Sequence, residues 1–218
     1  SDLVKISSEG ILVTSSVYNF EIQDYSEGSI WKIDYDGKVR WKEETVGRAW
    51  SLSDYQGQAV IGLSRPKGGY AIASETGIEY FELEEKKPVT AGCKLDNGGI
   101  VFGHSNGSVT EMYGGVCSTV SVGESAICAM DCRSSWVVGL DSGVISTSES
   151  VGSWNTKSFE SIDVVSYGPS LEGNTGIWYS SWNGKGRIFL VDSLVGGLQL
   201  ELSHGSRIVT CFATEELI

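Results

Sequence analysis

The chain has 218 residues, of which 40% are hydrophobic and 20% charged; this composition excludes wholesale disorder because it supplies enough apolar surface for a core. Sixteen basic and 28 acidic residues give a formal charge of -12, which repels a phosphate backbone and argues against nucleic acid as the main ligand. No apolar run approaches the roughly eighteen residues of a membrane span, so none is predicted.

Five similar hairpins follow one another along the chain. Each begins with an apolar strand, and these strands are predicted at residues 11–16, 59–64, 100–105, 136–141 and 177–182. A turn glycine follows each strand, at Gly28, Gly69, Gly107, Gly143 and Gly186. A second glycine series runs in step with the first, at Gly37, Gly77, Gly115, Gly152 and Gly197. The repeat of about forty residues is the period of a four-stranded propeller blade.

Two further strands complete each repeat. The inner strands are predicted at residues 48–53, 90–95, 127–131, 163–167 and 208–212, and the outer strands at residues 38–42, 78–82, 116–120, 154–158 and 198–202. Most of them alternate large and polar residues, as strands with one packed face do. The sequence therefore predicts a single all-β domain over residues 1–218, a β-propeller of five four-stranded blades with essentially no helix.

One inner strand is surplus, because residues 3–7 can also serve the first hairpin. We expect the C-terminal strand at residues 208–212 to complete the first blade and close the ring, which removes two exposed edges. Residues 3–7 would then lie outside the ring or pair at an edge. The alternative is an incomplete propeller that a partner protein completes.

The aligned inner strands place three of the five cysteines in one column, which contains Trp50, Cys93, Cys128, Val165 and Cys211. We interpret this column as small apolar positions in a narrow core between blades. A reactive thiol would instead need a nearby base or positive charge. Since no Cys-x-x-Cys pair and no signal peptide is evident, we expect a reduced, intracellular and cytoplasmic protein.

Three segments resemble the middle of WD40 repeats: residues 100–111, 136–147 and 186–192. In that family two small residues end one strand, a tight turn follows, and the next strand ends in Trp-Asp. Residues 203–212 are similar to the family's Gly-His followed by an inner strand. The resemblance implies a WD40-like propeller that serves as a rigid platform for protein assembly and not as an enzyme.

Candidate catalytic and metal-binding motifs have simpler explanations. Residues 103–107 match the Gly-x-Ser-x-Gly pattern with Ser105 as nucleophile, but that elbow requires a helix afterwards, and residues 108–112 are predicted to continue as a strand. Residues 34–38 are typical of a hairpin turn and lack the further ligands of a calcium loop. No cofactor, metal site or catalytic residue is predicted.

An alternative function would use acids gathered at the propeller axis. Asp96, Asp131 and Asp163 lie near inner-strand ends, and blades can bring distant carboxylates together. A propeller hydrolase or a sugar-binding propeller with an axial site is therefore the competing hypothesis.

The loops that follow the apolar strands are expected to share one rim. The longest, residues 17–27, carries Tyr18, Phe20 and Tyr25, more apolar surface than a turn needs. Aromatic and arginine side chains anchor protein interfaces. The predicted protein-binding residues are Tyr18, Phe20, Tyr25, Arg48, Arg65, Lys67, Trp182 and Lys185. The acidic charge favours a partner with basic segments, although Tyr18, Phe20 and Trp182 could instead cover the blade tops as local core.

Overall fold

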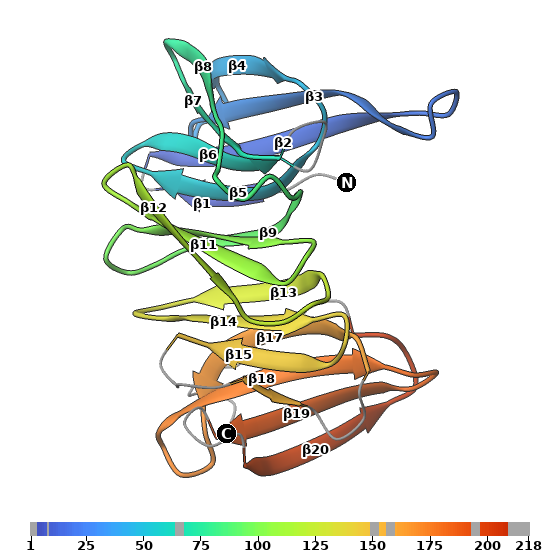
Figure 1. The fold of residues 1–218 in the computed structure, drawn as a ribbon. Coiled ribbons are helices and arrows are strands. Elements are labelled where there is room, and N and C mark those ends of the chain that lie inside the picture. The colour runs from blue at the N-terminus through green and yellow to red at the C-terminus, as the bar shows by residue number, and fades with distance from the viewer. Residues whose placement is uncertain are drawn as a thin grey trace. The chain divides into compact units, whose positions relative to one another are not determined.

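The computed structural model describes residues 4–7, 9–63, 68–148, 153–155, 160–192 and 197–208. In these residues the chain is all-β, with twenty strands in five four-stranded antiparallel sheets and no helix (Figure 1). Each sheet takes four consecutive strands in sequence order, so the predicted repeat is confirmed at the level of the sheet.

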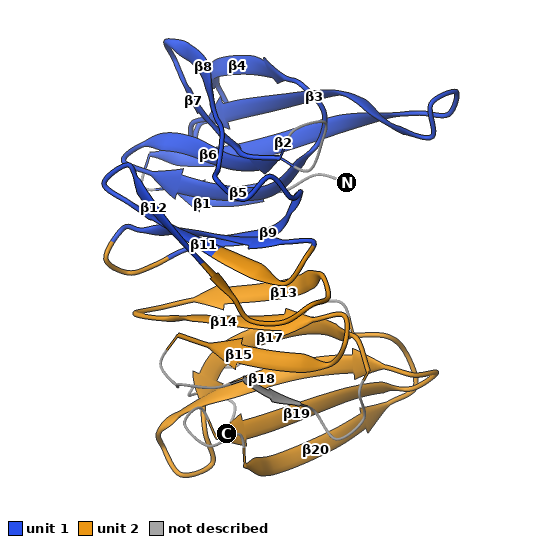
Figure 2. Cartoon of the chain, in the orientation of Figure 1, with its two compact units in different colours: residues 1–94, 98–105, 110–119 blue, residues 95–97, 106–109, 120–218 orange. Residues whose placement is uncertain are grey.

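The chain divides into two compact units (Figure 2). Unit 1 contains residues 1–94, 98–105 and 110–119. Sheet 1 is formed by β1 (Val4–Ser7), β2 (Gly10–Asn19), β3 (Asp24–Ile33) and β4 (Val39–Thr45). Sheet 2 is formed by β5 (Ala49–Tyr55), β6 (Gln58–Leu63), β7 (Tyr70–Ser74) and β8 (Gly77–Phe81). Sheet 3 has residues in both units and consists of β9 (Val89–Lys94), β10 (Ile100–His104), β11 (Ser108–Tyr113) and β12 (Val116–Ser121).

Unit 2 contains residues 95–97, 106–109 and 120–218. Sheet 4 is formed by β13 (Ile127–Cys132), β14 (Trp136–Leu140), β15 (Val144–Thr147) and β16 (Ser153–Asn155). Sheet 5 is formed by β17 (Ile162–Pro169), β18 (Thr175–Trp182), β19 (Gly186–Asp192) and β20 (Leu198–His204).

Burial falls from the second strand of a sheet to its outer strand. Every residue of β10 and β14 is buried, whereas every residue of β12 is exposed. The second strands read as continuous apolar runs because both of their faces are covered. Neighbouring sheets of a unit share these cores, as where Val60 and Tyr70 of sheet 2 pack with Val89, Ile100 and Phe102 of sheet 3.

A β-bulge recurs in four inner strands and corrects the predicted cysteine column. Each bulge leaves one residue out of the strand pairing: Trp50 in β5, Thr90 in β9, Cys128 in β13 and Asp163 in β17. Cys93 and Val165 therefore do not share a column with Trp50 and Cys128. The prediction of a buried column was wrong, because Trp50 and Cys128 are exposed; a bulge inserts one residue and turns its side chain away from the packed face. Cys211 lies outside the described residues.

Turn formation accounts for only part of the first glycine series. A side chain at Gly28, Gly69, Gly107 or Gly186 would collide with a main-chain carbonyl oxygen at the end of the outer strand or in the segment that follows it. Gly28 and Gly186 lie within strands β3 and β19. These four glycines therefore mark where the backbone of a sheet approaches itself closely.

The N-terminal strand occupies the place that we expected the C-terminal strand to fill. Strand β1 pairs with β2 from Val4 opposite Val13 to Ser7 opposite Gly10 and so completes sheet 1. The predicted inner strand at residues 208–212 lies outside the described residues except for Ile208. Closure of a ring and a single domain over residues 1–218 stay predictions.

The sequence predicted a reduced protein, and this prediction was wrong for two of the cysteines. Cys93 and Cys132 are disulfide-bonded, whereas Cys117 and Cys128 are free thiols. Disulfides persist mainly in oxidising compartments. The two bonded cysteines therefore argue against a reducing environment, and the cytoplasmic location stays a prediction.

Candidate functional site

The candidate site is the tip of the hairpin that joins β2 to β3, residues 17–27, which we call the aromatic hairpin. It extends beyond the neighbouring strands of unit 1 (Figure 1). Asn19 shapes the tip, because its side-chain oxygen accepts a hydrogen bond from the Glu21 amide at 2.9 Å. Gln23 adopts a positive φ of 53°, which closes the turn.

Three predicted binding residues form one aromatic cluster on this hairpin. The ring of Tyr18 makes edge contacts with Phe20 at 5.1 Å and with Tyr25 at 5.3 Å between centroids. Such T-shaped pairs stabilise the cluster by about 0.5–1.5 kcal/mol each. Phe20 is nevertheless 85% exposed and Tyr18 42% exposed. The prediction that these side chains form a local core is wrong for Phe20, which the fold leaves almost uncovered.

Arg48, the fourth predicted residue, joins the cluster from the loop between β4 and β5. Its guanidinium carbon lies 4.6 Å from the Tyr25 ring centre and 4.2 Å from that of Trp50. The bulge in β5 turns Trp50 outward and so supplies the second ring. The Nε atom of Arg48 is buried and has no hydrogen-bond partner in the described part of the chain. Stacking between two rings therefore holds the side chain.

An acidic pocket lies beside the aromatic hairpin. It has a volume of about 100 Å³ and is lined by strand residues of sheet 1 that include Ser16, Val17, Glu27 and Glu44. The Ser16 hydroxyl oxygen is buried and has no hydrogen-bond partner among the described residues. Glu44 pairs with Lys42 at 3.6 Å on the exposed surface. Two carboxylates and an unpaired hydroxyl form a pocket suited to a small cationic group.

The other four predicted binding residues are not brought into this cluster. Arg65 and Lys67 lie outside the described residues. Trp182 and Lys185 belong to unit 2, where they are exposed on and beside the turn between β18 and β19. This turn occupies the same position in sheet 5 as the aromatic hairpin does in sheet 1.

The turn in unit 2 is organised by an ionic network around Glu160. The Ser181 hydroxyl donates to Glu160 Oε2 at 2.7 Å, and the Asn183 amide and the Arg187 guanidinium donate to Glu160 Oε1. Arg187 also lies 3.7 Å from Glu201. Burial, aided by the Glu201 charge, raises the pKa of the neighbouring Tyr179 to about 12. These groups satisfy one another, so the turn is a rigid polar element.

The suspected nucleophile Ser105 lies in an ordinary turn. It follows β10, and strand β11 begins three residues later, so the helix of a nucleophile elbow is absent from this described segment. The adjacent His104 is fully buried, with Nδ1 3.1 Å from the Lys87 carbonyl oxygen and Nε2 2.8 Å from the Thr110 hydroxyl. Burial lowers the pKa of His104. The neutral ring therefore ties three segments of unit 1 together.

The acids of the axial hypothesis have separate structural partners. The Asp131 carboxylate accepts hydrogen bonds from the Tyr167 amide at 2.8 Å and from the Ser166 hydroxyl at 3.2 Å. Asp163 pairs with Arg207. The Asp96 amide donates to the Arg133 carbonyl oxygen at 2.9 Å. Asp131 and Asp163 thus act as acceptors within the fold.

The turn at residues 34–38 is closed by one aspartate. Its carboxylate accepts from the amides of Asp36 at 3.2 Å and Lys38 at 2.8 Å, and it pairs with Arg40 at 3.1 Å. The predicted hairpin turn is confirmed, since the Asp34 carboxylate accepts hydrogen bonds from amides of the turn itself. Within the described ranges, no three His, Cys, Asp or Glu side chains are grouped to hold a metal ion.

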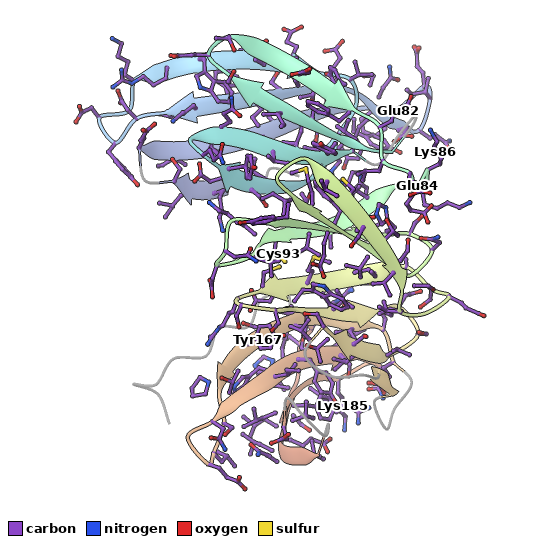
Figure 3. All side chains as sticks on the ribbon, turned by 60° about the vertical axis from the view of Figure 1, so that its left-hand side comes forward. Glu82, Glu84, Lys86, Cys93, Tyr167 and Lys185 are labelled. Atoms are coloured by element: carbon purple, nitrogen blue, oxygen red, sulfur yellow. The ribbon has the colours of Figure 1, made fainter. Side chains whose placement is uncertain are left out.

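The acidic run near the end of sheet 2 lies on the surface (Figure 3). Glu82, Glu84 and Lys86 are exposed, and Lys86 donates to Glu82 at 2.9 Å. Such an exposed pair contributes less than about 1 kcal/mol. The run is therefore a solvated edge and adds nothing to the site.

No protein-family model matches the chain, and no curated protein matches it either. The likeness to WD40 repeats thus stays a hypothesis from the sequence. Among the residues that the structure describes, no helix is long and apolar enough to cross a membrane.

Proposed function

We propose that the chain is a non-catalytic, WD40-like β-propeller that binds a basic segment of a partner protein at the aromatic hairpin and thereby supports assembly of a complex. In this proposal each four-stranded sheet is one blade. The observation that carries the proposal is the gathering of Tyr18, Phe20, Tyr25 and Arg48 into one cluster in which the Tyr18 and Phe20 rings are exposed. Exposed aromatic residues beside a stacked arginine are the usual anchors of a protein interface.

Charge supports a basic partner. Glu21, Asp24 and Glu27 lie on the hairpin itself, and Glu27 and Glu44 line the small pocket beside it. The whole chain carries a formal charge of -12, which attracts a cationic segment over a distance and speeds its encounter with the site. In the bound state, an apolar side chain would cover Phe20 while a lysine or arginine enters the acidic pocket.

Selection of peptides displayed on phage tests this function. We expect the intact chain to enrich peptides that combine lysine or arginine with a large apolar residue. Replacing both Tyr18 and Phe20 by alanine should weaken the selected peptide about 100-fold, because truncating anchor residues costs about 2 kcal/mol or more. Tyr113→Ala provides the matched control, since Tyr113 is an exposed aromatic residue of β11 outside the hairpin.

Two results would contradict the proposal. One is enrichment of acidic or purely apolar peptides. The other is equal binding by the Tyr18/Phe20 double variant and the Tyr113→Ala control. The double variant removes both ring pairs of Tyr18 and should unfold at a somewhat lower temperature, whereas Tyr113→Ala should be nearly unchanged, so peptide binding is compared at a temperature where both variants are folded.

A further inference from the structure

Unit 1 contains a second concave feature, which the sequence did not indicate. A cavity of about 550 Å³ lies between sheet 1 and sheet 2. It is lined by Glu9, Lys32, Arg40, Trp41, Gln56, Gly57, Gln58, Ser74, Glu75 and Thr76. These residues come from β3, β4, β6 and the end of β7 and from the turns β1–β2, β5–β6 and β7–β8, and we call this space the turn cavity. Its volume is typical of a small-molecule site, about 300–1,000 Å³.

The turn cavity has a built polar wall. The Lys32 side chain is 8% exposed, and its ammonium donates to Glu9 Oε2 at 2.8 Å and to the Gly57 carbonyl oxygen at 3.1 Å. An ammonium has three N–H donors, so one remains for a ligand. The hydrogen bond from Lys32 lowers the pKa of Glu9, which keeps that carboxylate ionised as an acceptor.

The charges on the cavity wall cancel. Lys32 and Arg40 contribute two positive charges, and Glu9 and Glu75 contribute two negative ones. Arg40 is further neutralised by Asp34, 3.1 Å from its Nε atom. Each cation of the wall thus has an anionic partner, and the remaining carboxylate, that of Glu75, is exposed to solvent; the wall therefore favours a neutral ligand.

The remaining wall combines hydrogen-bonding groups with one aromatic ring. The side chains of Gln56 and Gln58 form no hydrogen bond within the described part of the chain. An apolar ligand would bury these amides without partners, at a considerable cost. Trp41 is half-buried against the core of sheets 1 and 2 and also lines the cavity, so it offers an apolar surface fixed in position.

We propose that the turn cavity binds a neutral saccharide. Hydroxyl groups both donate and accept, so a sugar can satisfy the Gln56 and Gln58 amides, the Glu9 carboxylate and the free Lys32 donor together. The C–H face of a sugar ring packs against Trp41. This site is independent of the aromatic hairpin, which lies at the opposite ends of β2 and β3, and it differs from the axial site of the competing hypothesis.

Isothermal titration of the intact chain with neutral di- and trisaccharides of glucose, galactose, mannose and N-acetylglucosamine tests the proposal. At least one saccharide should bind with saturation. Gln58→Ala should weaken that saccharide about tenfold, the effect of losing a paired amide. Gln199→Ala in unit 2 is the matched control and should leave the affinity unchanged. Should Gln58→Ala fold poorly in thermal unfolding, Gln56→Asn, which shortens the other amide side chain of the wall at an exposed position, serves as the second variant, with the same expected weakening.

Three outcomes would overturn this inference. The first is that none of the saccharides binds with saturation. The second is that the cavity variants bind the saccharide as tightly as the control does. The third is that inorganic phosphate competes with the saccharide, which would make the cavity an anion site. Failure of this experiment leaves peptide binding at the aromatic hairpin unaffected, since the Tyr18/Phe20 variant is expected to bind the saccharide normally.

Discussion

The two ends of sheet 1 use the same strands for opposite purposes. At the hairpin end, β2 and β3 run on past their neighbours and expose the Tyr18 and Phe20 rings. At the turn end, short turns from sheets 1 and 2 enclose a polar space in which Lys32 is almost wholly buried. The length of the strands and turns therefore decides what each end of the sheet presents. A long hairpin produces a projecting apolar surface, and matched short turns produce a hollow between sheets.

Glycine substitutions at the two ends give the largest expected difference. Gly28→Ala at the base of the hairpin would drive a methyl group into the Thr45 side chain and the Gly47 carbonyl oxygen, and should lower the free energy of unfolding by about 2–3 kcal/mol. Gly37→Ala meets open space at φ +82° and should cost about 1 kcal/mol through backbone strain alone. Urea denaturation of both variants measures the difference; equal losses would mean that the close approach at Gly28 is not tight.

The stacked arginine sharpens the comparison within the hairpin end. Arg48→Ala should weaken binding of a selected basic peptide about tenfold, because Tyr25 and Trp50 lose the cation that fixes their positions. Arg40→Ala at the turn end is the control and should not change peptide affinity. Surface plasmon resonance measures the peptide affinity of both variants. A larger loss of affinity in Arg40→Ala than in Arg48→Ala would place the peptide at the turn end of sheet 1 and contradict the proposal.

Buried His104 should make the fold sensitive to mild acid. Its folded-state pKa is lowered, chiefly by burial, so the unfolded chain takes up the proton first. The stability contributed by neutral His104 is present above the unfolded value near 6.5 and is lost as the pH falls below it, at up to about 1.4 kcal/mol per pH unit. Urea denaturation between pH 7.5 and 5 should show this slope in the parent and in His204→Asn, and much less of it in His104→Asn. An unchanged slope in His104→Asn would contradict the assignment.

The smallest expected effect comes from the exposed carboxylate at the turn end. Glu9→Gln removes the ion pair to Lys32, in which the Glu9 side chain is exposed to solvent. The folded-state pKa of Glu9 is lowered, so this pair stabilises the fold above the unfolded pKa and ceases to do so as the pH falls through the folded value. The melting temperature should fall slightly at pH 7, and the difference from the parent should vanish in strong acid. A difference that persists there would contradict an ionic cause.

Much of the fold could be predicted from the sequence because its signals are local. The apolar runs and glycine spacings place the strands of all five sheets within a few residues, for instance predicted residues 100–105 against β10 at Ile100–His104. The aromatic hairpin could be predicted for the same reason, since Tyr18, Phe20 and Tyr25 are neighbours in sequence.

The errors arose where one residue shifts a register or where distant segments meet. A bulge after Ala49 or Ile127 is invisible in the alternation of side chains, so the cysteine column was aligned wrongly. The turn cavity was missed because its walls come from several separate segments, none of which is unusual by itself. Trp50 was assigned to the core, although its place in a bulge turns it outward against Arg48.

Hydrogen exchange of the intact chain with and without a selected basic peptide tests the central claim most directly. Binding at the aromatic hairpin predicts slower exchange in residues 17–27 and 45–50, with no change in the turns at residues 34–37 and 74–76. Protection confined to those turns, or to unit 2, would contradict the assignment of the hairpin as the docking surface.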